Sequence, residues 1–557
     1  MFKSGLITAA MMMATAQTAL AQQPPPSAGS QLQQIPAPPA PERGAPNINV
    51  VRPDESVPAT EPGARVQVNA LRVTGNTLFS QDELIDAAGV RPGSELTLAE
   101  LRAAAARMSA FYNARGYFLA QAYLPAQDII NGEVTIAVVE GRYGTTQIRN
   151  ATNLSDRAAR NVLSGLRPGD PVAAAPLERR LLLLSDIPGV EVRSTLAPGA
   201  AVGTSDLIVD LAPGPRVSGS IEADNAGNRF TGEYRAGGTI NLNNPTGLGD
   251  LASLRVLAST GGLAYGRAAY QVPLGDATIG AAYTHLRYQL GREFSDLEAD
   301  GTANIFSVFG SYPLIRSRNA NLYALAGLDL RMLEDRIGLV SAQSDKTSHV
   351  LTLGLTGDTH DSFGGDGRNF FSVSWTLGKL FIDSPVERAI DAATARTAGT
   401  FSRVQVSAAR LQTVTGPLSV YAAVRGQLAF DNLDSSEKME LGGANAVRSY
   451  PEGEAYGDQG YIATLEARLM LTGLESTLPG RLQLFGFVDV GEVEFSRNPW
   501  FAGSNHARRS AVGAGLTWFA PDDLILRATY ATRLGDEPVT SGPDRAGRFW
   551  VHFAKLF

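Results

Sequence analysis

The sequence predicts two α+β modules followed by a transmembrane antiparallel β-barrel of about 16 strands. Three observations lead to this prediction: a secretory signal at the N-terminus, a β-α-α-β-β order that occurs twice, and strand-like alternation that replaces the helical period after Gly214. At 557 residues the chain is too long for one ordinary domain. The expected divisions are a signal peptide at 1–21, a proline-rich linker at 22–65, modules at 66–142 and 143–215, and the barrel at 216–557.

The first residues have the features of a cleaved secretory signal. Lys3 precedes a short apolar stretch, and the triplet Ala19-Leu20-Ala21 matches a cleavage site. A membrane-spanning helix is the alternative, but it needs ~20 apolar residues, more than this stretch offers. The sequence therefore predicts export from the cytosol and a mature chain that begins at Gln22.

The linker at 22–65 carries 11 of the 31 prolines in the chain. Repeated proline removes backbone donors and holds the chain extended. We therefore expect a semi-stiff linker without a core.

Two modules with one order of elements follow the linker. The first begins with a strand and a capped helix, and its second helix starts with the capping-box spacing Thr97 to Glu100. The expected elements lie at 66–79, 80–89, 97–117, 119–129 and 133–141, and then at 145–151, 155–165, 176–187, 190–199 and 205–214. Each module resembles the POTRA domain, the periplasmic polypeptide-binding module of outer-membrane assembly and secretion proteins.

Beyond Gly214 apolar and polar residues alternate with a period of two, as Leu328 and Leu330 do with Asp329 and Arg331. One apolar and one polar face, with glycine-rich turns between strands, is typical of a membrane barrel whose outside meets lipid and whose lumen is wet. A large water-soluble β-sandwich is the alternative. The signal peptide argues against it, as does a last strand that ends in Phe557, because a terminal aromatic resembles the recognition signal of outer-membrane barrels.

The length of the barrel segment indicates its size. Residues 217–557, at roughly 20 residues per strand with its share of turns and loops, give about 16 strands. A barrel this wide has a lumen, so some part of the protein must occupy or gate it.

The order of signal peptide, proline-rich linker, two POTRA-like modules and barrel resembles the haemolysin secretion/activation family, the transporters of two-partner secretion. The resemblance covers nearly the whole mature chain, with local matches such as "YPLIRSRNANLYALAGLDLRMLED" and "AVRSY". The family carries a Val-Arg-Gly-Tyr/Phe tip on a long loop that folds back into the lumen. Val447, Arg448, Ser449 and Tyr450 match this tip, with serine in place of glycine.

The family also has a Phe-x-Asp-x-Gly motif on a nearby strand, which Phe487, Asp489 and Gly491 match. Period two places Glu466 and Asp489 on the inward face, because their apolar neighbours face outward. Two inward carboxylates near a loop that carries one cation, Arg448, predict a charge-assisted latch between loop tip and wall. The alternative is that each charge merely lines the lumen.

We expect no enzymatic activity, cofactor or metal site. A wide wet lumen would not raise the pKa of Glu466 or Asp489 by desolvation, which argues against an acid–base pair. Nucleophile-elbow, P-loop and zincin motifs are absent from the sequence. The lack of cysteine excludes disulfides and thiolate metal sites. A net charge of -7, spread along the chain, gives no footprint for nucleic acid.

The resemblance implies an outer-membrane translocator with its POTRA modules in the periplasm. These modules would capture an unfolded exoprotein, by adding its extended chain to a sheet edge, and the barrel would export it without ATP. The other expected partners are outer-membrane lipids and the barrel assembly machinery, which would recognise the strand ending in Phe557. The main alternative is an outer-membrane protein assembly or insertion factor, and the second is a passive or solute-specific porin.

Members of this family often carry an N-terminal helix that plugs the barrel. The longest proline-free stretch of the linker, 27–35, is a marginal helix without packing support. We therefore expect residues 22–65 to contribute at most a short or mobile plug, and the Arg448 loop to be the principal obstruction. Deletion of residues 22–60 would then change pore current little, whereas shortening the loop would raise it greatly.

Overall fold

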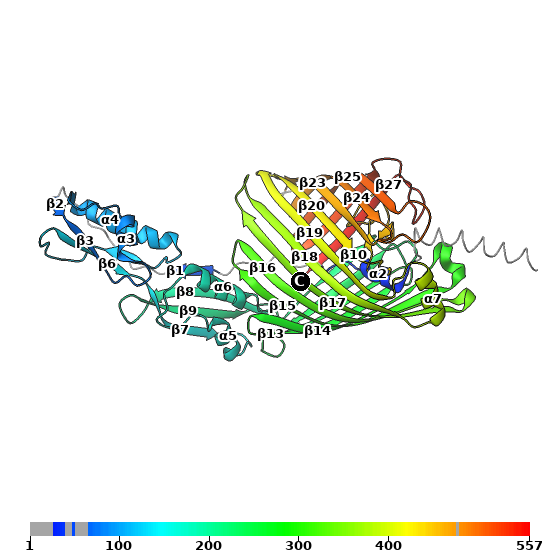
Figure 1. Cartoon of the computed structure of the whole chain (residues 1–557), viewed down its shortest axis with the longest axis horizontal. Coiled ribbons are helices and arrows are strands. Elements are labelled where there is room, and N and C mark those ends of the chain that lie inside the picture. The colour runs from blue at the N-terminus through cyan, green and yellow to red at the C-terminus, as the bar shows by residue number, and fades with distance from the viewer. Residues whose placement is uncertain (1–25, 39–46, 51–64, 475–477) are drawn as a thin grey trace, which may run out of the picture. The chain divides into compact units, whose positions relative to one another are not determined.

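The computed structural model describes residues 26–38, 47–50, 65–474 and 478–557 (Figure 1). The expected signal peptide at 1–21 lies outside the described residues, as do parts of the linker. The chain divides into two compact units: one contains the barrel and the short helix α2 (Ala28–Gln33), and the other contains both modules. Within the described ranges, no helix is long and apolar enough to cross a membrane.

The first module has the predicted β-α-α-β-β order, with two short strands added. Its elements are β2 (Arg65–Val68), β3 (Ala70–Thr74), α3 (Gln81–Ala88), β4 (Ser94–Thr97), α4 (Leu98–Ala114), β5 (Gln121–Tyr123) and β6 (Glu133–Val139). β6 is the centre of a three-stranded sheet, parallel to β3 and antiparallel to β5. The capping box between Thr97 and Glu100 is present, which explains why α4 begins where the spacing predicts.

The second module repeats this order and gains a strand from the linker. Its elements are β7 (Arg142–Asn150), α5 (Asp156–Leu163), α6 (Ala174–Ser185), β8 (Val190–Pro198) and β9 (Thr204–Pro213). The added strand, β1 (Asn47–Val50), pairs in parallel with β8, so that the sheet order is β1-β8-β9-β7.

The linker, expected to be semi-stiff and without a core, contributes two short regular elements. Helix α2 and strand β1 both come from the linker, and they lie in its two longest proline-free stretches, 27–35 and 47–52. Because proline has no backbone N–H, these stretches are where the linker can supply consecutive donors to a helix or a sheet.

The barrel is a closed sheet of 16 antiparallel strands, the number expected from its length. Its strands are β10 (Val217–Asp224), β11 (Arg235–Asn243), β12 (Leu251–Ser259), β13 (Ala264–Leu274), β14 (Ala277–Gln289), β15 (Ala299–Arg316), β16 (Ala320–Ile337), β17 (Ala342–Asp361), β18 (Gly367–Ile382), β19 (Gly399–Thr415), β20 (Leu418–Ala429), β23 (Gln459–Leu471), β24 (Arg481–Glu494), β25 (His506–Ala520), β26 (Leu524–Arg533) and β27 (Gly547–Leu556). β27 pairs with β10, and reciprocal backbone hydrogen bonds of 2.8 and 3.1 Å join Gly219 to Phe557 at this seam.

Shorter elements lie in the loops between the barrel strands. They are the 3-10 helices η1 (Arg292–Leu297) and η2 (Gly338–Val340), helix α7 (Pro385–Ala393), and the paired strands β21 (Met439–Glu440) and β22 (Tyr456–Gly457). The last two belong to the loop between β20 and β23.

The two faces of the barrel wall follow the predicted alternation. Leu328, Leu428 and Val488 are 58%, 60% and 43% exposed on the outside. Between the outward leucines of β16, Asp329 and Arg331 form an ion pair of 2.8 Å on the opposite face. The sheet closes on itself, so a β-sandwich is excluded.

One carboxylate, Glu140, is buried in the first module directly after β6. It is 4% exposed and accepts hydrogen bonds from the backbone N–H groups of Thr77 and Leu78, at 2.6 and 2.8 Å, and from the Tyr112 hydroxyl at 3.1 Å. Burial raises the pKa of Glu140, but the hydrogen bonds from the Thr77 hydroxyl, the two backbone N–H groups and Tyr112 together lower it by more, so its pKa lies below that of an ordinary glutamate. The carboxylate ties the connection between β3 and α3 to the end of the sheet.

Glu140→Ala should destabilise the first module by about 2–4 kcal/mol, because several buried donors lose their acceptor. Hydrogen–deuterium exchange of residues 66–141 in the full-length protein measures this. Glu133→Ala is the matched control, since it removes an exposed carboxylate from the same module. Equal protection in the two variants would contradict this role of Glu140.

Candidate functional site

The loop between β20 and β23 carries Arg448, and its tip is buried against the inner wall of the barrel. The Arg448 side chain is 6% exposed and that of Asp489 is fully buried. Arg448 Nε and Nη2 donate to the two carboxylate oxygens of Asp489 on β24 at 2.8 and 2.7 Å. Nη1 donates to Glu466 on β23 at 2.6 Å. This planar, bidentate pairing uses the donor geometry of a guanidinium, which a lysine cannot reproduce.

The Phe-x-Asp-x-Gly motif of β24 supports this contact on the side of the barrel wall. The guanidinium carbon of Arg448 lies 3.3 Å from the ring centroid of Phe487, so the cation rests on an aromatic face. A Cβ on Gly491 would lie 2.5 Å from Leu441 Cδ1, so the glycine leaves room for the loop to pack against the strand. Phe487, Asp489 and Gly491 therefore act on one face of β24, as period two requires.

The two carboxylates, Glu466 and Asp489, differ in how many other cations they contact. Arg468 and Arg527 donate to Glu466 at 2.9 and 3.3 Å. Asp489 accepts from the Thr464 hydroxyl at 2.9 Å, but in the described part of the chain its only ion pair is with Arg448. Loss of Arg448 would therefore leave Asp489, rather than Glu466, without a counter-charge.

The remaining residues of the loop tip are fixed by packing and by hydrogen bonds. Val447 and Tyr450 are fully buried in an apolar cluster, and the Tyr450 hydroxyl donates to the Glu537 carbonyl at 2.9 Å. Trp550 Nε1 donates to the Arg448 carbonyl at 2.7 Å. Ser449 has no positive φ, so the turn does not require the glycine of the family motif.

Further ion pairs hold the loop to the wall on both sides of the lumen. These pairs were not predicted from the sequence. The available signal was a loop rich in acidic residues together with arginines at inward-facing positions of the strands. The pairs are Asp434 with Lys346 of β17 at 2.7 Å, Glu437 with Arg403 of β19 at 2.8 Å, and Glu454 with Arg509 of β25 at 2.7 Å. Glu437 also pairs with Arg331 of β16, so the loop bridges from β16–β19 to β23–β25.

Helix α2 lies in the lumen, where it has the packing support that its sequence does not guarantee (Figure 1). Its first residue, Ala28, is fully buried and packs in a cluster with Leu257, Leu286 and Leu333. The Ala28 N–H donates to Asp335 at 2.8 Å. The helix is short, as expected, but its docking was not foreseen. The available signal was the presence of apolar residues at inward positions of the wall.

The helix also rests on the Arg448 loop. A Cβ on Gly29 would lie 2.5 Å from Ser436 Cβ, and the hydroxyls of Ser27 and Ser435 are 2.9 Å apart. Gln34 donates to the Tyr456 hydroxyl at 2.6 Å. A helix seated in this way obstructs the lumen, so we now expect deletion of residues 22–60 to raise the pore current rather than leave it nearly unchanged.

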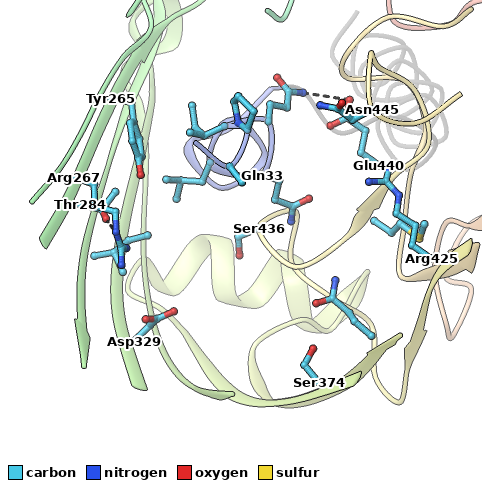
Figure 2. A pocket seen from close by; sticks show the side chains of 18 of the residues that line it. Gln33, Tyr265, Arg267, Thr284, Asp329, Ser374, Arg425, Ser436, Glu440 and Asn445 are labelled. Carbon is cyan, nitrogen blue, oxygen red and sulfur yellow. Dashed lines mark hydrogen bonds between the residues drawn. The ribbon is translucent and has the colours of Figure 1, made fainter. Parts of the chain in front are cut away.

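A cavity of about 1060 Å³ lies beside the helix and the loop (Figure 2). Polar and apolar side chains both line it, and among the charged ones cations outnumber carboxylates. Figure 2 shows, among the lining residues, Gln33 of the helix, Arg267, Thr284, Asp329 and Ser374 of the wall strands, and Ser436 and Glu440 of the loop. Among the described residues, no group of three or more His, Cys, Asp or Glu side chains could hold a metal ion.

Two family models match the chain. The model of the haemolysin secretion/activation proteins ShlB, FhaC and HecB matches residues 203–516, and the ShlB-type POTRA domain matches residues 66–141. The heme/hemopexin transporter protein HuxB of Haemophilus influenzae is 27% identical, and the aligned region covers 84% of this chain and 82% of HuxB. The outer membrane transporter CdiB of Dickeya dadantii is 23% identical, and the aligned region covers 78% of this chain and 75% of CdiB.

Solved structures share the fold. CdiB from Escherichia coli has a TM-score of 0.71 at 21% identity, and the match covers 91% of this chain and 93% of that one. BamA from Haemophilus ducreyi, in a form that lacks POTRA domains 1-3, has a TM-score of 0.53 at 14% identity, with coverage of 88% and 100%.

Gly29→Val should dislodge α2, because the branched side chain would overlap Ser436. We expect the open-pore current in planar bilayers to rise, though by less than after shortening of the Arg448 loop. Gly266→Val is the matched control, since a side chain at this barrel glycine meets nothing within 4 Å. An unchanged current in Gly29→Val would mean that the helix does not obstruct the lumen.

Proposed function

Because the chain belongs to the haemolysin secretion/activation family, we propose that it captures an unfolded exoprotein in the periplasm and exports it through its barrel. It is an outer-membrane protein whose POTRA domain lies in the periplasm, and relatives such as HuxB and CdiB are transporters. The exported partner is a separate secreted protein, as is the rule in two-partner secretion.

The contact between Arg448 and the wall carries this proposal. A buried charge is costly unless it is paired, so the guanidinium holds the loop tip at one place, between Glu466 and Asp489. The opposite end of the loop is held by Glu437. The loop therefore bridges the lumen, and a polypeptide can cross only when the loop moves aside.

Ion pairs suit a loop that must be both fixed and released. When a pair opens into a wet lumen, water solvates the separated charges, so opening costs less than it would in a dry core. The Arg448 contact is accordingly a latch, with Val447, Ser449 and Tyr450 as its tip and Phe487 and Gly491 as its seat. The sequence encodes no ATP-binding motif, and folding of the exported chain outside the cell would prevent its return.

Two further partners are part of the proposal. The outward apolar side chains of the barrel would meet outer-membrane lipid. The last strand, β27, together with the exposed ring of Phe557 directly after it, would be recognised by the barrel assembly machinery.

We propose a transporter without catalytic activity. Glu466 and Asp489 are both paired with arginines, so neither carboxylate is placed to exchange a proton with a substrate.

Arg448→Ala should reduce export about tenfold or more while the barrel still assembles, because the contact positions a loop and not the wall. Asp489→Asn should reduce export more than Glu466→Gln, since it removes two charge-assisted hydrogen bonds to Arg448 and the other removes one. The measurement is secretion of an exoprotein co-expressed with the transporter, and the first candidate to try is any very long secreted β-helical protein that a neighbouring reading frame encodes.

Arg410→Ala is the matched control for this series. It removes another arginine that pairs with both oxygens of an aspartate, Asp361, elsewhere in the same barrel. Its export should equal that of the wild type. Normal export by the Arg448, Asp489 and Glu466 variants would return all three residues to the role of lumen lining.

A further inference from the structure

The second module carries a sheet edge that the linker of the same chain already occupies. β1 lies alongside β8 with Asn47 opposite Arg193 and Val50 opposite Leu196 (Figure 1). β1 is only four residues long, and Pro46 directly precedes it. Because proline cannot donate to a ladder, and Pro53 follows three residues later, the linker cannot extend this pairing far.

The edge is longer than the strand that covers it. β8 has nine residues, of which β1 pairs with residues 193–196. Parallel pairing is also slightly weaker per residue than antiparallel pairing. An extended polypeptide that paired with the full length of β8 would therefore make more ladder hydrogen bonds than β1 makes.

The corresponding edge of the first module is less suited to accept a strand. β5 has three residues, and the outward N–H of its middle residue, Ala122, donates to the Ser109 hydroxyl at 2.8 Å. The side chain of Ser109 thus takes the place that an added strand would need. Of the two modules, the second offers the longer edge, and that edge demonstrably accepts a strand.

We propose that β1 is an internal occupant of the site where the unfolded exoprotein docks, and that the exoprotein adds to β8 by displacing β1. This inference rests on the export function proposed above. Main-chain hydrogen bonds make such a site tolerant of sequence, as a carrier of unfolded chains requires.

The exchange would also change the tether of the lumen helix. With β1 in place, residues 34–46 link α2 to the second module, a reach of roughly 45 Å at most. With β1 displaced, the link runs to β2 through residues 34–64, with a reach of roughly 105 Å. Displacement of β1 would therefore lengthen the stretch of chain between α2 and the first strand that anchors it.

A disulfide that locks β1 onto β8 tests the exchange. Asn49 and Thr195 are opposite one another, and the chain has no cysteine of its own, so Asn49→Cys with Thr195→Cys forms one defined bond. The probe is reduced, carboxymethylated lactalbumin, a permanently unfolded polypeptide, added to the full-length protein in detergent. The oxidised pair should not bind it, and reduction should restore binding to the wild-type level.

Proline substitutions test the opposite change. Ile48→Pro with Asn49→Pro removes donors from β1, so the probe should bind about tenfold more tightly than to the wild type. Glu55→Pro with Ser56→Pro, in the same linker but outside β1, should leave binding unchanged. Equal binding to the oxidised and reduced cysteine pair would overturn the exchange and leave the export function standing. Absence of binding to every variant would contradict the export function itself, and the exchange with it.

Discussion

The buried guanidinium of Arg448 sets the arrangement of the lumen. A cation in this position destabilises the protein by several kcal/mol unless carboxylates meet it. Period two along β23 and β24 turns Glu466 and Asp489 inward, and Gly491 leaves space for the loop to reach them. The identity of a few wall residues thus determines where the tip of a long loop lies, and we propose that this position controls what can pass through the lumen.

The Arg448 loop also supports helix α2, the second element that lies in the lumen. Ser435 and Ser436 contact the first turn of α2, and the next residue, Glu437, is clamped by arginines of β16 and β19. Helix, loop and wall form one connected set of contacts, so movement of the loop removes part of the seat of the helix.

Features that depend on local sequence were predictable, and features that depend on distant partners were not. The capping box at Thr97 and the inward direction of Asp489 follow from spacing over a few residues. The pairing of Glu437 with Arg403 does not, because many loop acids face many wall arginines. Nor does the docking of α2, because a six-residue helix owes its stability to packing and not to propensity. The position of β1 was hidden for the same reason, since its partner strand lies far along the chain.

Hydrogen–deuterium exchange of the amides in residues 442–457 tests most directly whether Arg448 and Asp489 act as one contact. Arg448→Ala and Asp489→Asn should each accelerate exchange by about two to three orders of magnitude, since breaking a buried ion pair costs roughly 3–5 kcal/mol. The double variant should exchange no faster than the faster single variant, because either change already removes the shared interaction. Additive acceleration in the double variant, or unchanged exchange in either single one, would contradict the latch.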